Sequence, residues 1–175
     1  MVQARPIAAV QTRSVAIVQR IATITEVLAL GLWIGALCGF AFVFAPVAFH
    51  TLPDLNVFAN LIARTVLALT HLGYGLGAIA LLAALTRGAR IRAVAITTMI
   101  ALSFYHTHFV MHEMEATLHT FNGSIAQTPK TDPRRTRYDA EHQWSTRVYG
   151  TVVLLGLIAL GAASQPTHHQ RAKVL

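Results

Sequence analysis

Acidic residues and cysteine are scarce in this 175-residue chain, and charge of either sign is low. Charged residues make up 12% of the sequence and hydrophobic residues 54%, and the mean hydropathy is +0.53. This composition excludes an ordinary soluble globular domain. The single cysteine, Cys38, excludes an intramolecular disulfide and any cluster of thiolates. A metal site in this chain would therefore have to use nitrogen and oxygen ligands.

Long apolar runs take up most of the chain. Each reaches the ~20 residues that a helix needs to cross the hydrocarbon core of a bilayer. They predict an all-α, four-helix transmembrane bundle over residues 21–164, embedded in the lipid bilayer, with no soluble domain. We expect the third helix to continue to His119 and the fourth to begin near Tyr138. The four runs are Ala22–Phe49, Val57–Thr86, Ile91–Val110 and Trp144–Ala163.

The segments that flank the bundle are short and basic. Residues 1–20 combine spaced arginines with Ile and Val and contain no acid. This pattern favours a short amphipathic helix on the cytoplasmic membrane surface, with a flexible tail as the alternative. Residues 165–175 form a basic C-terminal tail.

The basic residues predict the orientation of the bundle. Arg87, Arg90 and Arg92 lie in the tight connection between the second and third runs, and both terminal segments are basic. An even number of spans places these groups on one side, which the positive-inside rule makes cytoplasmic, with both termini inside. We expect an integral protein of the bacterial inner (plasma) membrane. The net charge of +7 does not indicate nucleic-acid binding, because the basic residues form no single patch.

The first run carries a repeated pattern of small residues and one proline. Gly31, Gly35 and Gly39 recur at every fourth position, which lets a neighbouring helix approach closely. We expect the glycine-bearing first and second helices to pack together. Pro46 should kink or loosen the last turn of the first helix.

A stripe of potential metal ligands lies at the end of the third helix. At about 100° per residue, His108, His112, Glu115 and His119 fall on one face, while His106 points the other way. Ligands spaced i, i+4 on one helix can hold a single ion together. We expect His108, His112 and Glu115 to be primary metal ligands.

The fourth helix should complete this site, because its outer end lies beside that of the third helix. Imidazole and carboxylate suit a transition-metal ion, Zn or Cu above all, so the predicted function is metal handling at the extracytoplasmic side. The alternative is a set of salt bridges that needs no ion. The predicted ligands on this helix are Glu141 and His142, supported by Arg147, Tyr149 and Asp139, with Arg147 also a partner for Glu113 or Glu115.

Other functions remain open at this stage. A structural or assembly subunit of a larger membrane complex, or a homo-oligomer, would use the polar cluster and the loop over residues 122–138 to bind a partner. Haem b held between His71 and His106 for electron transfer is a minor alternative. Enzyme activity is undecided, because the sequence contains no Gly-rich phosphate loop, nucleophile elbow or H-E-x-x-H motif.

Two short motifs resemble a known family. The segment from Leu32-Trp33-Ile34-Gly35 through Phe42, Ala45-Pro46 and Phe49, with His142-Gln-Trp-Ser145, is similar to the small membrane family of transmembrane protein 205 and its bacterial relatives, the DUF4149 domain. Tyr149 stands where that family tends to have Asn. The resemblance implies a four-span architecture more than a function, since the family has no settled biochemical activity.

Overall fold

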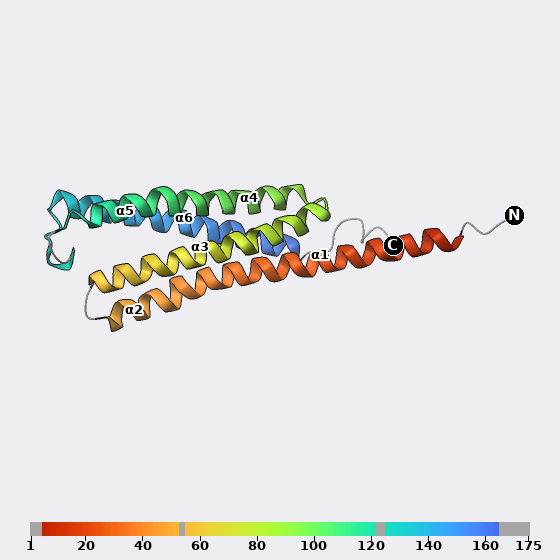
Figure 1. Cartoon of the computed structure of the whole chain (residues 1–175), viewed down its shortest axis with the longest axis horizontal. Coiled ribbons are helices and arrows are strands. Elements are labelled where there is room, and N and C mark those ends of the chain that lie inside the picture. The colour runs from red at the N-terminus through yellow and green to blue at the C-terminus, as the bar shows by residue number, and fades with distance from the viewer. Residues whose placement is uncertain (1–4, 53–54, 122–124, 165–175) are drawn as a thin grey trace.

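The protein is a bundle of long antiparallel helices (Figure 1). The computed structural model describes residues 5–52, 55–121 and 125–164, and these contain helices and no strands. The C-terminal tail predicted over residues 165–175 lies outside them. The elements are α1 (Arg5–Gly39), η1 (Phe40–Phe44), α2 (Ala45–Thr51), α3 (Leu55–Thr86), α4 (Arg90–Tyr105), η2 (His106–Val110), α5 (Met111–Leu118), η3 (Ile125–Gln127) and α6 (Pro133–Ala163).

The predicted four-helix transmembrane bundle is confirmed. Within the described residues, four helical stretches are long and apolar enough to cross a membrane, and large aliphatic and aromatic side chains are exposed along all of them. In a bilayer these exposed side chains face lipid. We call the end with the α3–α4 connection the inner end and the opposite end the outer end, following the predicted orientation. The stretches are Arg13–Thr51, Leu55–Thr86, Arg90–Leu118 and Pro133–Ala163.

The N-terminal residues extend the first span. α1 is one continuous helix from Arg5 to Gly39, and its beginning reaches past the inner ends of the other helices (Figure 1). Val15 and Val18, two of the aliphatic residues of this N-terminal segment, are exposed. The side chains of residues 1–12 lie outside the part that the structure describes, so the surface-lying arrangement stays a prediction.

Two short π-helical segments interrupt the spans at their outer halves. In η1 the extra residue per turn comes just before Pro46, whose ring and missing N–H disturb the preceding turn. In η2 it lies between α4 and α5 and begins at His106. Such π-helical turns are rare and occur frequently at functional sites.

The close approach of the first two spans differs from the one expected. A Cβ atom added at Gly31, Gly35 or Gly39 would have no neighbour within 4 Å, so this face of α1 is open. The contact is made instead by the glycines of α3. The Trp33 ring lies so close to Gly73 and Gly77 that a Cβ there would meet ring atoms at 2.4 Å and 2.9 Å respectively.

Small and aliphatic side chains fill the middle of the bundle. All four spans contribute to this apolar layer, and Leu30, Ile96 and Met99 in it are completely buried. The layer separates a polar region in the outer half from a charged cluster at the inner end. Its buried residues are Ala29, Leu30, Ile34, Ala80, Ala84, Ala93, Ile96 and Ala159, continued by Trp33, Leu37, Met99 and Val152.

Ile125 anchors the described part of the outer loop to the bundle. Ile125 in η3 is only 1% exposed, and its carbonyl oxygen accepts a hydrogen bond of 2.7 Å from Arg135 Nη1. α6 begins at Pro133, earlier than expected, because Asp132 caps it: the Asp132 carboxylate accepts a hydrogen bond from the backbone N–H of Arg134. The Arg134 guanidinium also holds the pKa of Asp132 down, at about 2.

Candidate functional site

His106 is the most buried histidine whose side chain the structure describes, and it lies inside the bundle. Its residue is 4% exposed, and its Nε2 atom lies 2.7 Å from Ser145 Oγ of α6. An ionisable side chain within a membrane span normally faces the bundle interior and marks a functional site. We call the group formed by His106, Ser145 and Tyr149 the His106 triad.

Tyr149 completes this triad one helical turn below Ser145. The His106 ring lies 6.0 Å from the Tyr149 ring between centroids, and Phe40 of η1 approaches the same ring at 6.0 Å. Both π-helical segments therefore contact Tyr149. The Tyr149 hydroxyl is buried and has no hydrogen-bond partner among the described residues. Because a buried hydroxyl without a partner is costly, this group calls for a further hydrogen-bond partner, which a water molecule would supply.

A small cavity opens beside the triad, and every span contributes to its wall. It has about 10 Å³ of space for the centre of a water molecule, close to what one water needs. A hydrogen bond of 3.0 Å between the hydroxyls of Thr70 and Thr107 lies at the same level. A water molecule here could bridge the polar groups of the wall. The lining residues are Trp33, Leu37, Leu69, Thr70, Ser103, His106, Val148, Tyr149 and Val152.

Polar groups continue from the triad to the outer end along the same face of α6. Glu141 precedes Ser145 by one turn, and its Oε1 atom accepts hydrogen bonds from Thr117 Oγ1 (3.0 Å) and Arg137 Nε (2.7 Å). Its Oε2 atom is buried without a hydrogen-bond partner in the part of the chain described. Arg137, Glu141, Ser145 and Tyr149 are spaced four residues apart and so form one polar stripe, which is exposed at Arg137 and partly buried at the other three residues.

The predicted metal ligands of the third helix face the other way. His108, His112 and Glu115 are exposed, and Glu115 lies 3.9 Å from the exposed His119 on the same stripe. The stripe exists, but the opposite face, with His106, Val110 and Thr117, packs against the bundle.

The predicted ligands on α6 do not converge with that stripe. His142 is exposed and stacks on Tyr138, with 6.5 Å between the ring centroids. Glu141 turns inward to Thr117 and Arg137. Among the residues that the structure describes, no group of three or more His, Cys, Asp or Glu side chains could hold a metal ion. The geometry therefore gives the metal hypothesis no support.

The predicted supporting residues take different roles. Arg137, not Arg147, pairs with Glu113, at 2.9 Å, whereas Arg147 is exposed. Arg147 lies ten residues further along α6, which puts it too deep to reach the outer end of α5. Asp139 binds Arg135 at 3.0 Å on the outer surface. Tyr149 alone of the three points into the bundle.

The two histidines predicted as haem ligands lie in different environments. His106 is buried in the triad, whereas His71 is exposed on α3 and contacts the Tyr74 ring at its edge. The cavity beside His106 has room for about one water molecule, far less than haem requires.

Comparison with known proteins places the chain in a family. The profile described as "Domain of unknown function (DUF4149)" matches residues 28–120, more than half of the chain. The chain belongs to the DUF4149 family. No curated protein and no solved structure matches it. The DUF4149 match includes Trp33, Thr70 and His106, whereas Ser145 and Tyr149 lie on α6 beyond its end.

Proposed function

We propose that this DUF4149 protein binds a small, uncharged hydrogen-bonding molecule, water included, in a polar site in the outer half of its bundle. In the predicted orientation this site faces the extracytoplasmic side of a bacterial inner membrane. The observation that carries the proposal is the buried His106, bonded to Ser145 beside a cavity that Tyr149 also lines, while the buried Tyr149 hydroxyl has no hydrogen-bond partner among the described residues.

The chemistry of the wall favours a neutral ligand. Histidine, serine, threonine and tyrosine both donate and accept hydrogen bonds, and no carboxylate, lysine or arginine lines the cavity. A charged ligand would lose its hydration there without gaining a counter-ion. The few polar groups within an otherwise apolar wall are typical of a small-molecule site.

Access is proposed from the outer end only. Glu141 and Arg137 continue the polar stripe outward from Ser145, whereas Val152, Gly156 and Ala159 on the same face of α6 are buried in the apolar layer. From His106 to Arg92 is 14 residues along the helix, or about 20 Å. The layer between these positions supports a closed-ended site over a continuous pore.

Thiol accessibility tests this proposal. In a Cys38→Ala background, Ser145→Cys and Val152→Cys each place one thiol on the inner face of α6, at the polar stripe and in the apolar layer respectively. We expect a small, uncharged, water-soluble thiol reagent to modify the Ser145→Cys variant roughly tenfold faster or more than the Val152→Cys variant, because only a hydrated thiol ionises and reacts. Equal rates in the two variants would refute an outward-opening polar site.

A second candidate function is a subunit of a larger membrane assembly or a homo-oligomer. One observation favours it: the open stripe of Gly31, Gly35 and Gly39 on α1, which is the kind of surface through which helices associate in lipid. Replacing Gly35 with Leu should then reduce the oligomeric fraction of the detergent-purified protein. The same change at Gly75, an equally open glycine on α3, is the matched control. A monomer in both variants and in the wild type would exclude the homo-oligomer.

A further inference from the structure

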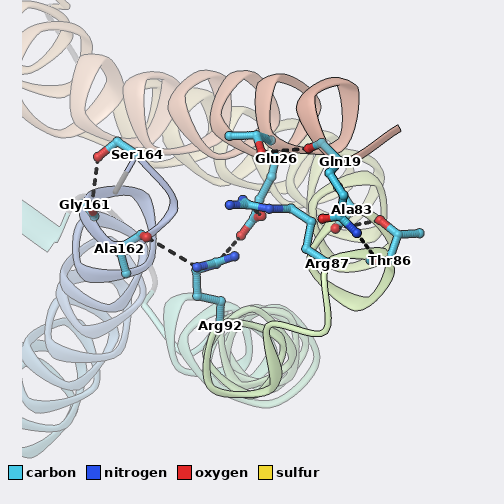
Figure 2. A network of polar contacts seen from close by, with 10 residues as sticks. Gln19, Glu26, Ala83, Thr86, Arg87, Arg92, Gly161, Ala162 and Ser164 are labelled. Atoms are coloured by element: carbon cyan, nitrogen blue, oxygen red, sulfur yellow. Dashed lines mark hydrogen bonds and ion pairs between the residues drawn. The ribbon is translucent and has the colours of Figure 1, made fainter. Parts of the chain in front are cut away.

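A buried cluster of charges ties the inner ends of the helices together (Figure 2). Glu26 of α1 is completely buried, although it lies in a membrane span. Its carboxylate accepts a hydrogen bond from Arg87 Nη1 at 2.7 Å and another from Arg92 Nε at 2.8 Å. The Arg87 side chain is 4% exposed and the Arg92 side chain 13%. We call these three residues the inner cluster.

The inner cluster joins α1, the α3–α4 connection, the start of α4 and the end of α6. Arg87 lies in the α3–α4 connection and Arg92 in the first turn of α4. Arg92 Nη1 also donates a long hydrogen bond, 3.3 Å, to the carbonyl oxygen of Ala162 at the end of α6. Figure 2 shows Arg92 between Glu26 on one side and Ala162 on the other. A backbone carbonyl in the last turn of a helix carries partial negative charge and lacks an intrahelical partner.

The charges of the inner cluster do not balance. Two guanidinium groups face one carboxylate, and Glu26 is the one acid that the sequence places on the inner side, because the other six lie between residues 54 and 141 in the outer segments. Arg92 Nη2 is buried and has no hydrogen-bond partner among the described residues. An uncompensated buried charge is strongly unfavourable, so a second anion would stabilise the cluster.

The surroundings of the inner cluster add further positive charge. Arg20 of α1 and Arg90 at the start of α4 are exposed at the same end of the bundle. A guanidinium group can donate two parallel, charge-assisted hydrogen bonds to two oxygens of one phosphate. Basic groups between spans on the cytoplasmic side bind anionic lipid headgroups, and the surface of that leaflet is itself negative.

We propose that the inner cluster is a phosphate site, in which an anionic lipid headgroup of the inner leaflet binds Arg92. The phosphate oxygens approach Arg92 from the side of Nη1, whose hydrogen bond to the Ala162 carbonyl oxygen is long at 3.3 Å, and neutralise the excess charge. The site lies about 20 Å from the His106 triad along the helix and is independent of it.

The test compares the stability of the full-length protein in nanodiscs of phosphatidylcholine alone and of phosphatidylcholine mixed with phosphatidylglycerol. We expect the wild type to unfold at a midpoint higher by roughly 2–4 °C in the mixture. Arg92→Gln should abolish this increase. This variant should still fold, because it leaves Glu26 and Arg87 as a neutral pair.

Two further variants make the result decisive. Glu26→Gln leaves two guanidinium groups without an acid, so it should unfold earlier in phosphatidylcholine and gain more than the wild type from phosphatidylglycerol. Arg64→Gln removes an exposed arginine at the outer part of α3, bonded to Asn60 at 2.9 Å, and should keep the wild-type increase.

Inorganic phosphate distinguishes the source of the anion. If phosphate in solution stabilises the protein in pure phosphatidylcholine as well as the anionic lipid does, the site binds free phosphate. If it does not, and the lipid does, the ligand is the headgroup. The proposal is overturned if neither has an effect, or if Arg64→Gln loses the increase as completely as Arg92→Gln.

Discussion

Replacing Gly73 with Ala should destabilise the packing of the wall of the proposed site, because the Trp33 ring leaves no room for a methyl group. The added Cβ atom would lie 2.4 Å from Trp33 Nε1 and 2.8 Å from Cε2, whereas contacting heavy atoms normally lie about 3.5–4.0 Å apart. The ring must therefore move by roughly 1 Å. It is 1% exposed and also lies against Gly77, so it has no free direction in which to move.

The magnitude follows from two opposing effects. Overpacking of this kind costs about 1–3 kcal/mol, and the severe overlap puts Gly73→Ala at the upper end. Alanine gains about 1 kcal/mol over glycine within a helix. The net loss of unfolding free energy is then about 2 kcal/mol, which corresponds to a fall in the thermal midpoint of roughly 4–8 °C.

The assay is thermal unfolding of the purified protein in detergent, followed by circular dichroism. Gly75→Ala is the matched control, because it is exposed on the same helix with nothing within 4 Å of the new methyl group, so its midpoint should stay the same or rise slightly. In a Trp33→Leu background the penalty at Gly73 should disappear, which would show that the two positions are coupled. A Gly73→Ala variant as stable as Gly75→Ala would refute the packing described here.

The remaining predictions concern histidines and the cap of α6. His106→Ala should lower the free energy of unfolding by about 1–3 kcal/mol, because it leaves a buried hydrogen-bond partner unsatisfied, whereas exposed His112→Ala should change it by less than ~0.5 kcal/mol; equal effects would contradict the burial of His106. Elemental analysis of the purified protein should give the same metal content for wild type and His108→Ala/His112→Ala; a stoichiometric ion lost in the double variant would revive the metal hypothesis. Because the pKa of Asp132 is lowered to about 2, its contribution to stability is present above its unfolded pKa of ~3.9 and is lost as the pH falls towards 2. Asp132→Asn, which keeps a capping side chain, should flatten the acid limb of a stability–pH curve; an unchanged limb would contradict this.

The fold was predictable because hydrophobic length is a strong signal. The apolar runs predict four spans, and the structure has four candidate spans in the same order. The ends were harder. α6 begins at Pro133 and not near Tyr138, because Asp132 and Pro133 are favourable residues for a helix start. They lie outside any apolar run, so hydrophobic length did not indicate them.

The candidate site was half predictable. Helical periodicity correctly grouped His108 and His112 on one face and His106 on another, but it does not say which face packs inward. The apolar stripe of the same helix carries that information. Ile96 and Met99 are buried, and steps of three and four residues lead from them to His106 and Val110. The metal hypothesis gave more weight to the number of histidines on a face than to this apolar stripe, and it therefore selected the exposed face.

Glu26 shows the opposite lesson. It is the lone acid within the first apolar run, and a buried acid requires a cationic partner. The arginines that indicate the orientation of the bundle, Arg87 and Arg92, supply it. The pairing could therefore be inferred by matching charges on one side of the membrane. The net positive charge of the inner cluster could not be inferred from the sequence, because burial and distances come only from the structure.

The most direct test of the central claim is to detect water at His106 itself. In solid-state NMR of the protein labelled at histidine and at the methionine methyl groups, in lipid, magnetisation transferred from water should reach the His106 ring nearly as fast as it reaches the exposed His112. It should not reach the methyl group of buried Met99. This result would place water beside the His106 triad and none in the apolar layer between this triad and the inner end. A His106 ring that receives no more magnetisation than Met99 would mean that the cavity is dry, and the proposed polar site would not exist.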